Sequence, residues 1–228
     1  MNRLSKVTVG IFLVGILAAC SNATKLSTQP MPKSGFLPNY SILVPTYTSQ
    51  ADTRVWRYRK DGVSRDAYTA VILDPIYLNQ SATKEVSAET INKTKQALQE
   101  YMLSAVNSRG VKIVNVPGPG VARISVGITG AESSNDSLQP WNFTPIGLAL
   151  NAAAYAGGVN SKTPALLVES KITDSQSKEL IGEGLATVQG ESFRTGAGSV
   201  ESFVAMAQKV VRAALETAAN PSPTTASK

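Results

Sequence analysis

A single cysteine lies directly after an N-terminal apolar run, and this feature most constrains what the chain can fold into. Cys20 is the one cysteine of 228 residues, and the sequence contains no histidine. No disulfide can form within the chain, so the folded part must be stabilised by its own apolar core. The same composition excludes a Ser-His-Asp triad, a Cys-His pair and a zinc site built from histidine or cysteine.

The first 19 residues have the parts of a secretory signal. Met1–Lys6 is short and basic, and Val7–Leu17 is an uninterrupted run of apolar or small residues. That run is too short for a membrane-spanning helix, which needs about 20 apolar residues. Leu17-Ala18-Ala19-Cys20 resembles the lipobox of bacterial lipoproteins, in which the cysteine becomes the lipidated first residue. We therefore expect acyl chains on Cys20 to form a permanent membrane anchor.

Four segments are expected along the chain. They are a signal peptide over 1–19, a lipidated flexible tether over 20–34, one folded domain over 35–219 and a disordered tail over 220–228. The tether and tail are polar, contain proline and lack periodicity, which favours disorder. By resemblance to lipoprotein sorting, Ser21 after the cysteine favours the outer membrane of a Gram-negative bacterium, with the domain facing the periplasm. Without Arg3 and Lys6, which the signal peptide removes, 20 of the 22 basic residues remain beside 16 acidic ones. This mild excess suits a protein near anionic headgroups, although solubility alone would also explain it.

Hydrophobic periodicity predicts pairs of strands between two helices. The expected strands are, in chain order, 70–78, 111–116, 121–131, 166–173 and 180–189. One helix should cover 88–108, with Ser87 as its N-cap, and a second should begin after Ser199. The order predicts an α+β fold, with a mostly antiparallel sheet of about five strands and two main helices packed on one face.

Several short segments carry a family likeness. They are Gly35-Phe36-Leu37, Tyr40-Ser41, Leu43, 68–75, 145–148, Val168-Glu169 and 172–175. Together they resemble the bacterial lipoproteins catalogued as domain of unknown function 3313, a likeness that implies no established activity. Such proteins tend to have a glycine in the hairpin after Asp-Ser, where this chain has Lys178. The strand-helix order is also similar to the N-terminal module of the Tol translocation protein and the curli secretion lipoprotein, although fold does not fix function.

Two segments are candidate interaction surfaces. Residues 141–159 are apolar and rich in small residues, and form either a surface for a partner or a cover for the core. The candidate contact residues there are Trp141, Phe143, Ile146, Leu148, Leu150 and Tyr155. Residues 54–65 interleave basic and aromatic side chains, which suits an anionic partner, or else form an exposed twisted strand. The candidate residues there are Arg54, Trp56, Arg57, Tyr58, Arg59 and Lys60.

Four carboxylates surround the predicted hairpin, namely Glu169, Asp174, Glu179 and Glu183. Two converging carboxylates are the minimum for acid/base hydrolysis of cell-wall glycan. The simpler interpretation is that these groups are solvated or paired with Lys171 and Lys178.

Taken together, the sequence predicts a non-enzymatic envelope lipoprotein without a cofactor or metal. We expect it to bind another envelope protein or itself, and export argues against nucleic acid as a partner. One alternative is a subunit of an oligomeric envelope or secretion assembly. Another is a carboxylate-dependent hydrolase of cell-wall glycan.

Overall fold

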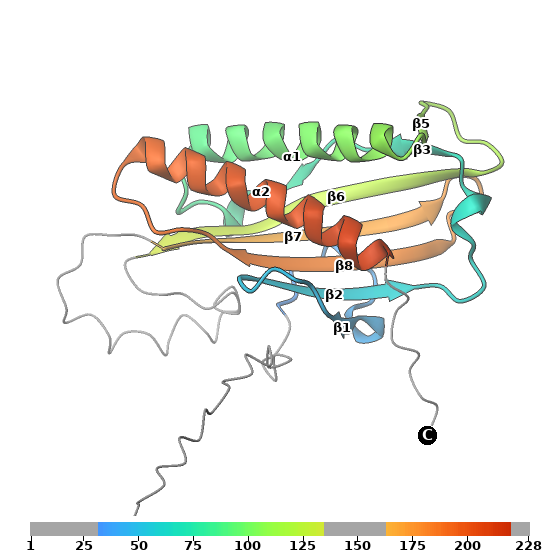
Figure 1. Ribbon diagram of the computed structural model, residues 1–228, viewed down its shortest axis with the longest axis horizontal. Helices are drawn as coiled ribbons and strands as arrows, with labels where there is room; N and C mark the ends of the chain where they lie inside the picture. Colours follow the sequence, from blue (N-terminus) through green and yellow to red (C-terminus); the bar gives the residue numbers. More distant parts are fainter. Residues whose placement is uncertain (1–31, 135–162, 220–228) are drawn as a thin grey trace, which may run out of the picture.

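The computed structural model describes residues 32–134 and 163–219, which form one eight-stranded sheet covered by two long helices (Figure 1). The sheet order is β1 (Val44–Thr46), β2 (Thr53–Arg59), β8 (Leu180–Gln189), β7 (Thr163–Asp174), β6 (Val121–Ser134), β3 (Ala70–Leu73) and β5 (Lys112–Ile113), with β4 (Tyr77–Leu78) also paired to β6. The helices are α1 (Ala88–Ser108) and α2 (Gly196–Ala219), with 3-10 turns at Tyr40–Ile42, Arg65–Ala67 and Gln80–Ala82.

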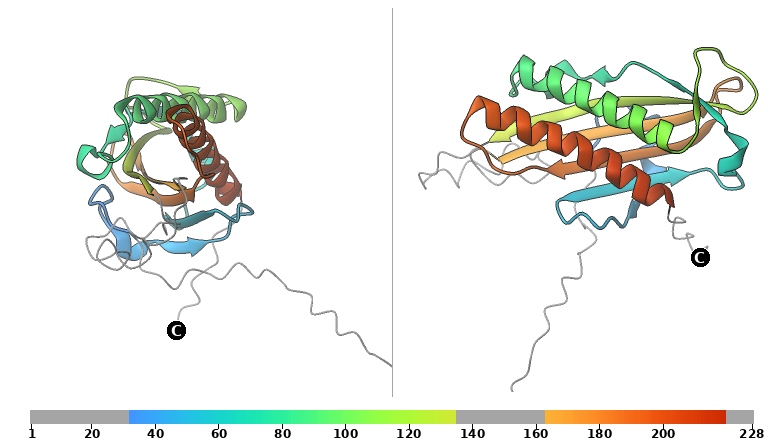
Figure 2. Two further views of the ribbon diagram at one scale, coloured as in Figure 1. Left: turned by 90° about the vertical axis from the view of Figure 1, so that its left-hand side faces the viewer. Right: turned by 45° about the horizontal axis from the view of Figure 1, so that its top comes forward.

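The mixed α and β composition with two main helices is confirmed, and both helices lie on one face of the sheet (Figure 2). The sheet is larger than the predicted five strands and is mixed rather than mostly antiparallel. Strand β3 pairs in parallel with β5 and β6, and β4 pairs in parallel with β6. Parallel pairing arises because α1 carries the chain back so that the next strands run in the same direction. The outermost strands, β1 and β5, have three and two residues.

The predicted strand 70–78 is divided into β3 and β4. Pro75 stands in the break and has no N–H to donate to a neighbouring strand. Asp74 directly follows β3 and accepts hydrogen bonds from Arg123 and Ser125, at 2.5 and 2.6 Å. The chain therefore bends after β3 and rejoins β6 further along.

Helix α1 has the predicted bounds. The Ser87 hydroxyl accepts a hydrogen bond from the N–H of Thr90 at 3.2 Å and satisfies one N–H of the first turn. Gly110 follows the helix with φ of 68°, a left-handed conformation that ends helices and that glycine adopts at low cost.

Helix α2 begins at Gly196, three residues before the predicted cap Ser199. The Thr195 hydroxyl accepts a hydrogen bond from the N–H of Gly198 at 3.1 Å. The N–H of Ser199 is already bonded to the carbonyl of Thr195 at 3.0 Å, which places Ser199 inside the first turn. Thr195 is therefore the residue that caps the helix.

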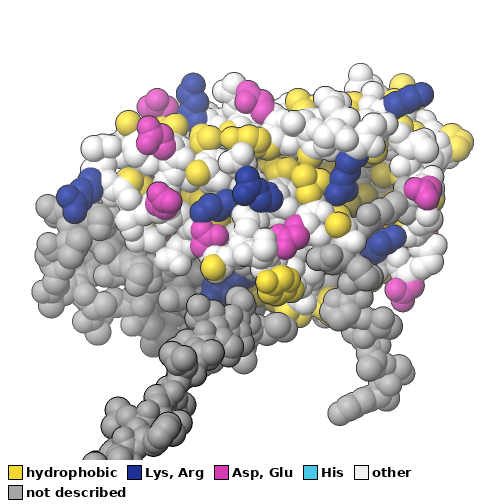
Figure 3. Space-filling view, in the orientation of Figure 1, with side chains coloured by type: hydrophobic (Ala, Val, Ile, Leu, Met, Phe, Trp, Pro, Cys, Tyr) yellow, Lys and Arg dark blue, Asp and Glu magenta, His cyan; other side chains and the backbone are white. Residues whose placement is uncertain are grey.

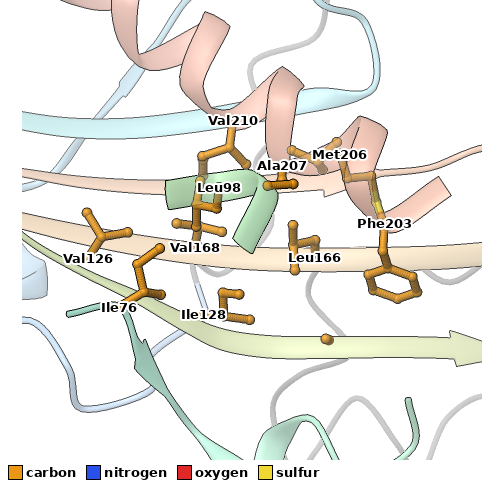
Figure 4. Packing of buried hydrophobic residues seen from close by; sticks show 14 of the residues in the cluster. Ile76, Leu98, Val126, Ile128, Leu166, Val168, Phe203, Met206, Ala207 and Val210 are labelled. Atoms are coloured by element: carbon orange, nitrogen blue, oxygen red, sulfur yellow. The ribbon is translucent and has the colours of Figure 1, made fainter. Parts of the chain in front are cut away.

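The main apolar core lies between the helices and the strands β6, β7 and β8. Figure 4 shows Phe203, Met206, Ala207 and Val210 of α2 above Leu166 and Val168 of β7, with Val126, Ile128, Ile76 and Leu98 around them. A bulge between Ile128 and Gly130 shifts the register of β6, so that Ala131 returns to the same core. Within the described residues, no helix is long and apolar enough to span a bilayer.

Candidate functional site: a clamp at the start of the domain

The opposite face of the sheet is covered by residues 32–43, which lie on the side away from both helices (Figure 2). Alternation along β7 sends Leu166 and Val168 toward the helices, and Leu167 and Glu169 toward this second face. The second apolar cluster consists of Leu37, Leu43, Trp56, Leu167 and Leu185. The folded part includes Pro32, which is buried, so it begins earlier than the predicted residue 35.

The Tyr40 hydroxyl is the centre of a hydrogen-bond network within this segment. It lies 3.1, 2.8 and 3.3 Å from the backbone N–H groups of Ser34, Gly35 and Leu37, which donate to it. It donates in turn to the carboxylate of Glu169, 3.0 Å from Oε2. The backbone of residues 34–37 therefore folds around one side-chain oxygen that is itself bonded to the sheet.

Ser34 makes a second bond to the same carboxylate. Its hydroxyl donates to Glu169 Oε2 at 2.6 Å and accepts from the N–H of Phe36 at 3.1 Å. We call Ser34, Tyr40 and Glu169 the N-terminal clamp. Because Glu169 is on β7, near the middle of the sheet order, the clamp bonds the first residues of the domain to a central strand.

Glu169 is completely buried, with 0% of its surface exposed. Burial raises its pKa above the ordinary value, because a charge in a poorly solvated site is unfavourable. The hydrogen bonds from Ser34 and Tyr40 act in the opposite direction, since they stabilise the ionised carboxylate. The hydrogen bonds of the clamp thus offset part of the free energy that is lost when the Glu169 carboxylate is buried.

A second acid lies beside the first on the same face. Glu183 of β8 is 3% exposed, and neither of its carboxylate oxygens makes a well-formed hydrogen bond in the described structure. Burial raises its pKa, while the nearby backbone N–H of Asn39 and the positive charge of Lys171, opposite it on β7, lower it. Glu169 is diagonal to Glu183 across the β7–β8 pair. The negative charge of Glu169 raises the pKa of Glu183 further.

The two buried acids are not accessible as an acid/base pair in the described structure. Residues 34–43 cover this face, and Glu169 is engaged by two hydroxyl donors. The interpretation of Glu169 and Glu183 as solvated hairpin carboxylates is wrong, because both point into the covered face rather than into solvent.

The other two hairpin carboxylates have structural contacts. Asp174 accepts hydrogen bonds from the N–H groups of Gln176 and Ser177, at 2.9 and 2.8 Å, and holds the turn. The bond from the Ser177 N–H is the main reason that the pKa of Asp174 is lowered. Glu179 forms an ion pair with Lys60, rather than with Lys171 or Lys178.

Aromatic side chains flank the clamp. Phe36 and Tyr77 stack with ring centroids 5.5 Å apart and an interplanar angle of 26°. Both rings lie on Gly127 of β6, where a Cβ atom would come within 3.1 Å of each. The Lys171 ammonium lies 5.0 Å from the centroid of Phe36, within cation-π range. A small residue on the sheet thus makes room for an aromatic pair beside the clamp.

The basic and aromatic residues of 54–60 do not form one surface. Strand β2 pairs with both β1 and β8 and lies inside the sheet rather than exposed at its edge. Trp56 and Tyr58 join the second apolar cluster, whereas Val55 joins the main core. Arg57 donates to the backbone carbonyl of Thr217 in α2, and Arg59 donates to the carbonyl of Val63 at 2.6 Å. Arg54 and Lys60 also have partners.

Other predicted sites lie outside the described residues. These are Cys20 and the whole of 141–159, including Trp141, Phe143, Ile146, Leu148, Leu150 and Tyr155. Among residues 32–134 and 163–219, no group of three or more acidic, histidine or cysteine side chains is arranged to hold a metal ion.

The sequence carries a signal for the clamp in the segments that share the family likeness. Tyr40 and Glu169 both belong to the segments that carry the family likeness, yet they are separated by 129 residues. Tyr68 and Asp174, from two other such segments, also meet, with the tyrosine hydroxyl 3.2 Å from Asp174 Oδ2. The family segments therefore mark two places where distant parts of the chain are bonded together.

Fold and clamp together define an α+β domain whose first residues are bonded into its own sheet. This chain belongs to the family described as "Protein of unknown function (DUF3313)", whose model matches residues 32–218. The resemblance drawn from the short segments is confirmed. A relative from Escherichia coli K12, named uncharacterized lipoprotein YdcL, is 28% identical over 169 residues, which are 73% of this chain and 75% of the relative.

Solved structures share only a distant likeness. A PelC dodecamer from Paraburkholderia phytofirmans is 12% identical, with 68% of this chain and 95% of that chain covered and a TM-score of 0.39. Lipoprotein GNA1162 from Neisseria meningitidis is 9% identical, with 67% and 99% covered and a TM-score of 0.40.

Proposed function

We propose that this chain is a lipid-anchored envelope lipoprotein and that its folded domain is a non-enzymatic binding module. The observation that carries the proposal is the N-terminal clamp. The residues that follow the predicted tether are bonded to a fully buried carboxylate on a central strand. A lipid on Cys20 would therefore be connected to the core of the domain rather than to a loosely attached end.

The N-terminal sequence and the E. coli relative support the lipid anchor. The lipobox ends at Cys20, and the relative carries the name lipoprotein. Ser21 supports the outer membrane as the destination, with the domain in the periplasm.

The fate of the acidic residues supports a binding role rather than catalysis. Glu169 is engaged in the clamp, Glu183 is covered, and Asp174 and Glu179 hold the hairpin turn and an ion pair. Two of these carboxylates are buried and the other two are engaged in the turn and the ion pair, whereas a glycan hydrolase would require two accessible carboxylates that converge.

Lipidation is tested by Cys20→Ser in cells fed a labelled fatty acid. The unmodified chain should incorporate label and fractionate with the outer membrane. The variant should accumulate as an unlabelled, uncleaved precursor. Label retained by the variant would refute the anchor.

The binding role is tested by photo-cross-linking in cells. A cross-linker at Leu148 probes 141–159, which by its apolar sequence is our first proposed contact surface. One at Lys60, which ends the 54–60 run and is partly exposed, probes whether that run still contributes a contact, and one at the exposed Lys93 of α1 is the matched control. A defined adduct from Leu148 or Lys60 but not from Lys93 is expected. If neither site yields an adduct above the control, the binding role fails, whereas an adduct between two copies identifies self-association.

A further inference from the structure

We propose that the surface around the N-terminal clamp rests on an anionic phospholipid bilayer. We call this the tether-side surface and define it by Lys33, Phe36, Tyr77 and Lys171. The inference rests on the lipid anchor proposed above and adds an orientation and a second point of membrane contact.

The first argument is where the described chain begins. Pro32 is twelve positions after Cys20, a stretch that spans at most about 43 Å when fully extended. Two residues further on, Ser34 is bonded to Glu169 on the face of the sheet opposite the helices. An anchored chain therefore reaches the domain on this face. Turning α1 or α2 toward the bilayer would require the same short stretch to pass around an edge of the sheet.

The second argument is the character of the exposed side chains. Tyr77 is 50% exposed although it is a large aromatic residue, and it stacks on Phe36. Tyrosine combines an apolar ring with a polar hydroxyl, and is enriched where membrane meets water. A rigid pair of rings supported by Gly127 presents such a group beside the point where the chain enters the domain.

The third argument is the sign of the outward charge. The acids of this region are withdrawn from solvent, since Glu169 is 0% and Glu183 is 3% exposed. Lys33 is exposed, and Lys171 is partly exposed, although its ammonium also lies over the Phe36 ring and opposite Glu183. Arg123 lies further along the same strand as Gly127 and is neutralised by Asp74. The tether-side surface is thus complementary to lipid phosphates.

The helix side differs in this respect. Its basic and acidic side chains are interspersed, with no region of a single sign (Figure 3). An anionic surface would attract and repel groups on that side in similar measure, which favours the tether-side surface for contact.

The experiment uses the chain from Ser21 to Lys228 without lipid, so that only the protein surface can bind. Its partition is measured by flotation with vesicles of phosphatidylglycerol and phosphatidylethanolamine, and with vesicles of phosphatidylcholine. We expect binding to the anionic vesicles that weakens with salt. Replacing both lysines, Lys33→Gln with Lys171→Gln, should reduce partition about thirtyfold, which is about 2 kcal/mol at roughly 1 kcal/mol per cation. Tyr77→Ser should give a smaller loss.

The matched control is Lys93→Gln, which removes one exposed cation from α1. It should bind as the unmodified chain does, and Lys33→Gln alone, an exposed change, should already lower binding about fivefold. Circular dichroism identifies any variant that fails to fold.

Three results would overturn the proposal: no preference for anionic vesicles, an equal loss in the Lys93 control, or binding to purified cell-wall glycan but not to vesicles. Because these proteins carry no lipid, such results would leave acylation of Cys20 untouched. Conversely, an unlabelled wild-type chain in the fatty-acid experiment would refute the anchor without changing the vesicle result.

Discussion

The two faces of the sheet are stabilised in different ways. The helix face is sealed by large apolar side chains, with Phe203, Met206 and Leu166 almost completely buried. The clamp face has a smaller apolar cluster and hides two carboxylates beneath a short segment without an α-helix. Apolar contact is non-directional and tolerates adjustment, whereas a buried acid needs donors in fixed positions. We infer that the helix face supplies most of the stability and the clamp face fixes where the chain enters.

The largest expected effect is in the helix-face core. Phe203→Ala removes a fully buried ring that contacts the strands below α2 and should lower the free energy of unfolding by about 3–5 kcal/mol. Urea unfolding followed by circular dichroism measures the change. The exposed Val116→Ala, in the loop after β5, is the control. A loss below about 1 kcal/mol at Phe203 would contradict the assignment of the main core to this face.

A clamp variant should have a smaller, more local effect. Tyr40→Phe keeps the ring but removes the hydroxyl that bonds Glu169 and the N–H groups of Ser34, Gly35 and Leu37. The expected loss of unfolding free energy is about 1–3 kcal/mol. Limited proteolysis should cut within residues 32–43 before the rest of the domain. Tyr47→Phe, at an exposed position, is the matched control. Simultaneous cleavage throughout the domain would argue against a separable clamp.

The buried acids make the clamp face sensitive to pH. Burial raises the pKa of Glu169 and Glu183, and raises that of Glu132 near the end of β6 to about 7. A group whose pKa is higher in the folded state binds its proton more tightly there. Its contribution to stability is therefore complete below the unfolded pKa, near 4.5, and is lost as pH rises through the folded pKa. We expect the domain to lose stability from mildly acidic to mildly alkaline pH.

Glu183→Gln tests this dependence. It should stabilise the domain by about 1 kcal/mol at pH 8, because the buried carboxylate makes no well-formed hydrogen bond, and change little near pH 4.5. Urea unfolding across this range measures the slope, and Glu201→Gln on the exposed side of α2 is the control. Equal slopes in the variant and the unmodified chain would show that folding does not raise the pKa of Glu183. The pKa values of Asp174 and Glu216 are lowered in the folded state. Their contribution to stability is therefore lost as the pH falls through those lowered pKa values, in more acidic solution.

The smallest expected effect lies in the hairpin turn, outside both faces. Among the described residues, Lys178 is the one non-glycine residue with positive φ, at 64°. A left-handed conformation costs an ordinary residue about 1–2 kcal/mol, while glycine loses more entropy on folding, so Lys178→Gly should stabilise by about 0.5 kcal/mol. Thermal unfolding should show a slightly higher midpoint. A lower midpoint would mean that the Lys178 contact with the carbonyl of Ser175 outweighs the strain.

The elements that could be predicted from the sequence are those whose signal is local. Helix α1 and the β7–β8 hairpin follow from apolar periodicity, a cap and a polar turn within a few residues of one another. The clamp could not be predicted in this way, because Tyr40 and Glu169 meet only after the intervening strands have folded. A glutamate in a strand resembles a solvent-facing residue, and only the covering segment shows that it is buried. Strand β1 was not predicted, because it is short and has Pro45 at its centre. The alternative of a twisted strand within 54–65 is close to β2, but its place between β1 and β8 depends on distant strands that no local pattern reveals.

The short strands at the edges of the sheet affect how copies of a membrane-anchored chain would meet one another. Molecules confined to a membrane plane meet their copies at high local concentration, and an unpaired strand edge is a template for aggregation. Here the outermost strands are β1, with three residues and a proline at its centre, and β5, with two. Neither offers a run of backbone donors and acceptors long enough to recruit another chain. With the lipid anchor proposed above, the described fold would allow dense packing in the membrane plane without joining its sheets into fibres.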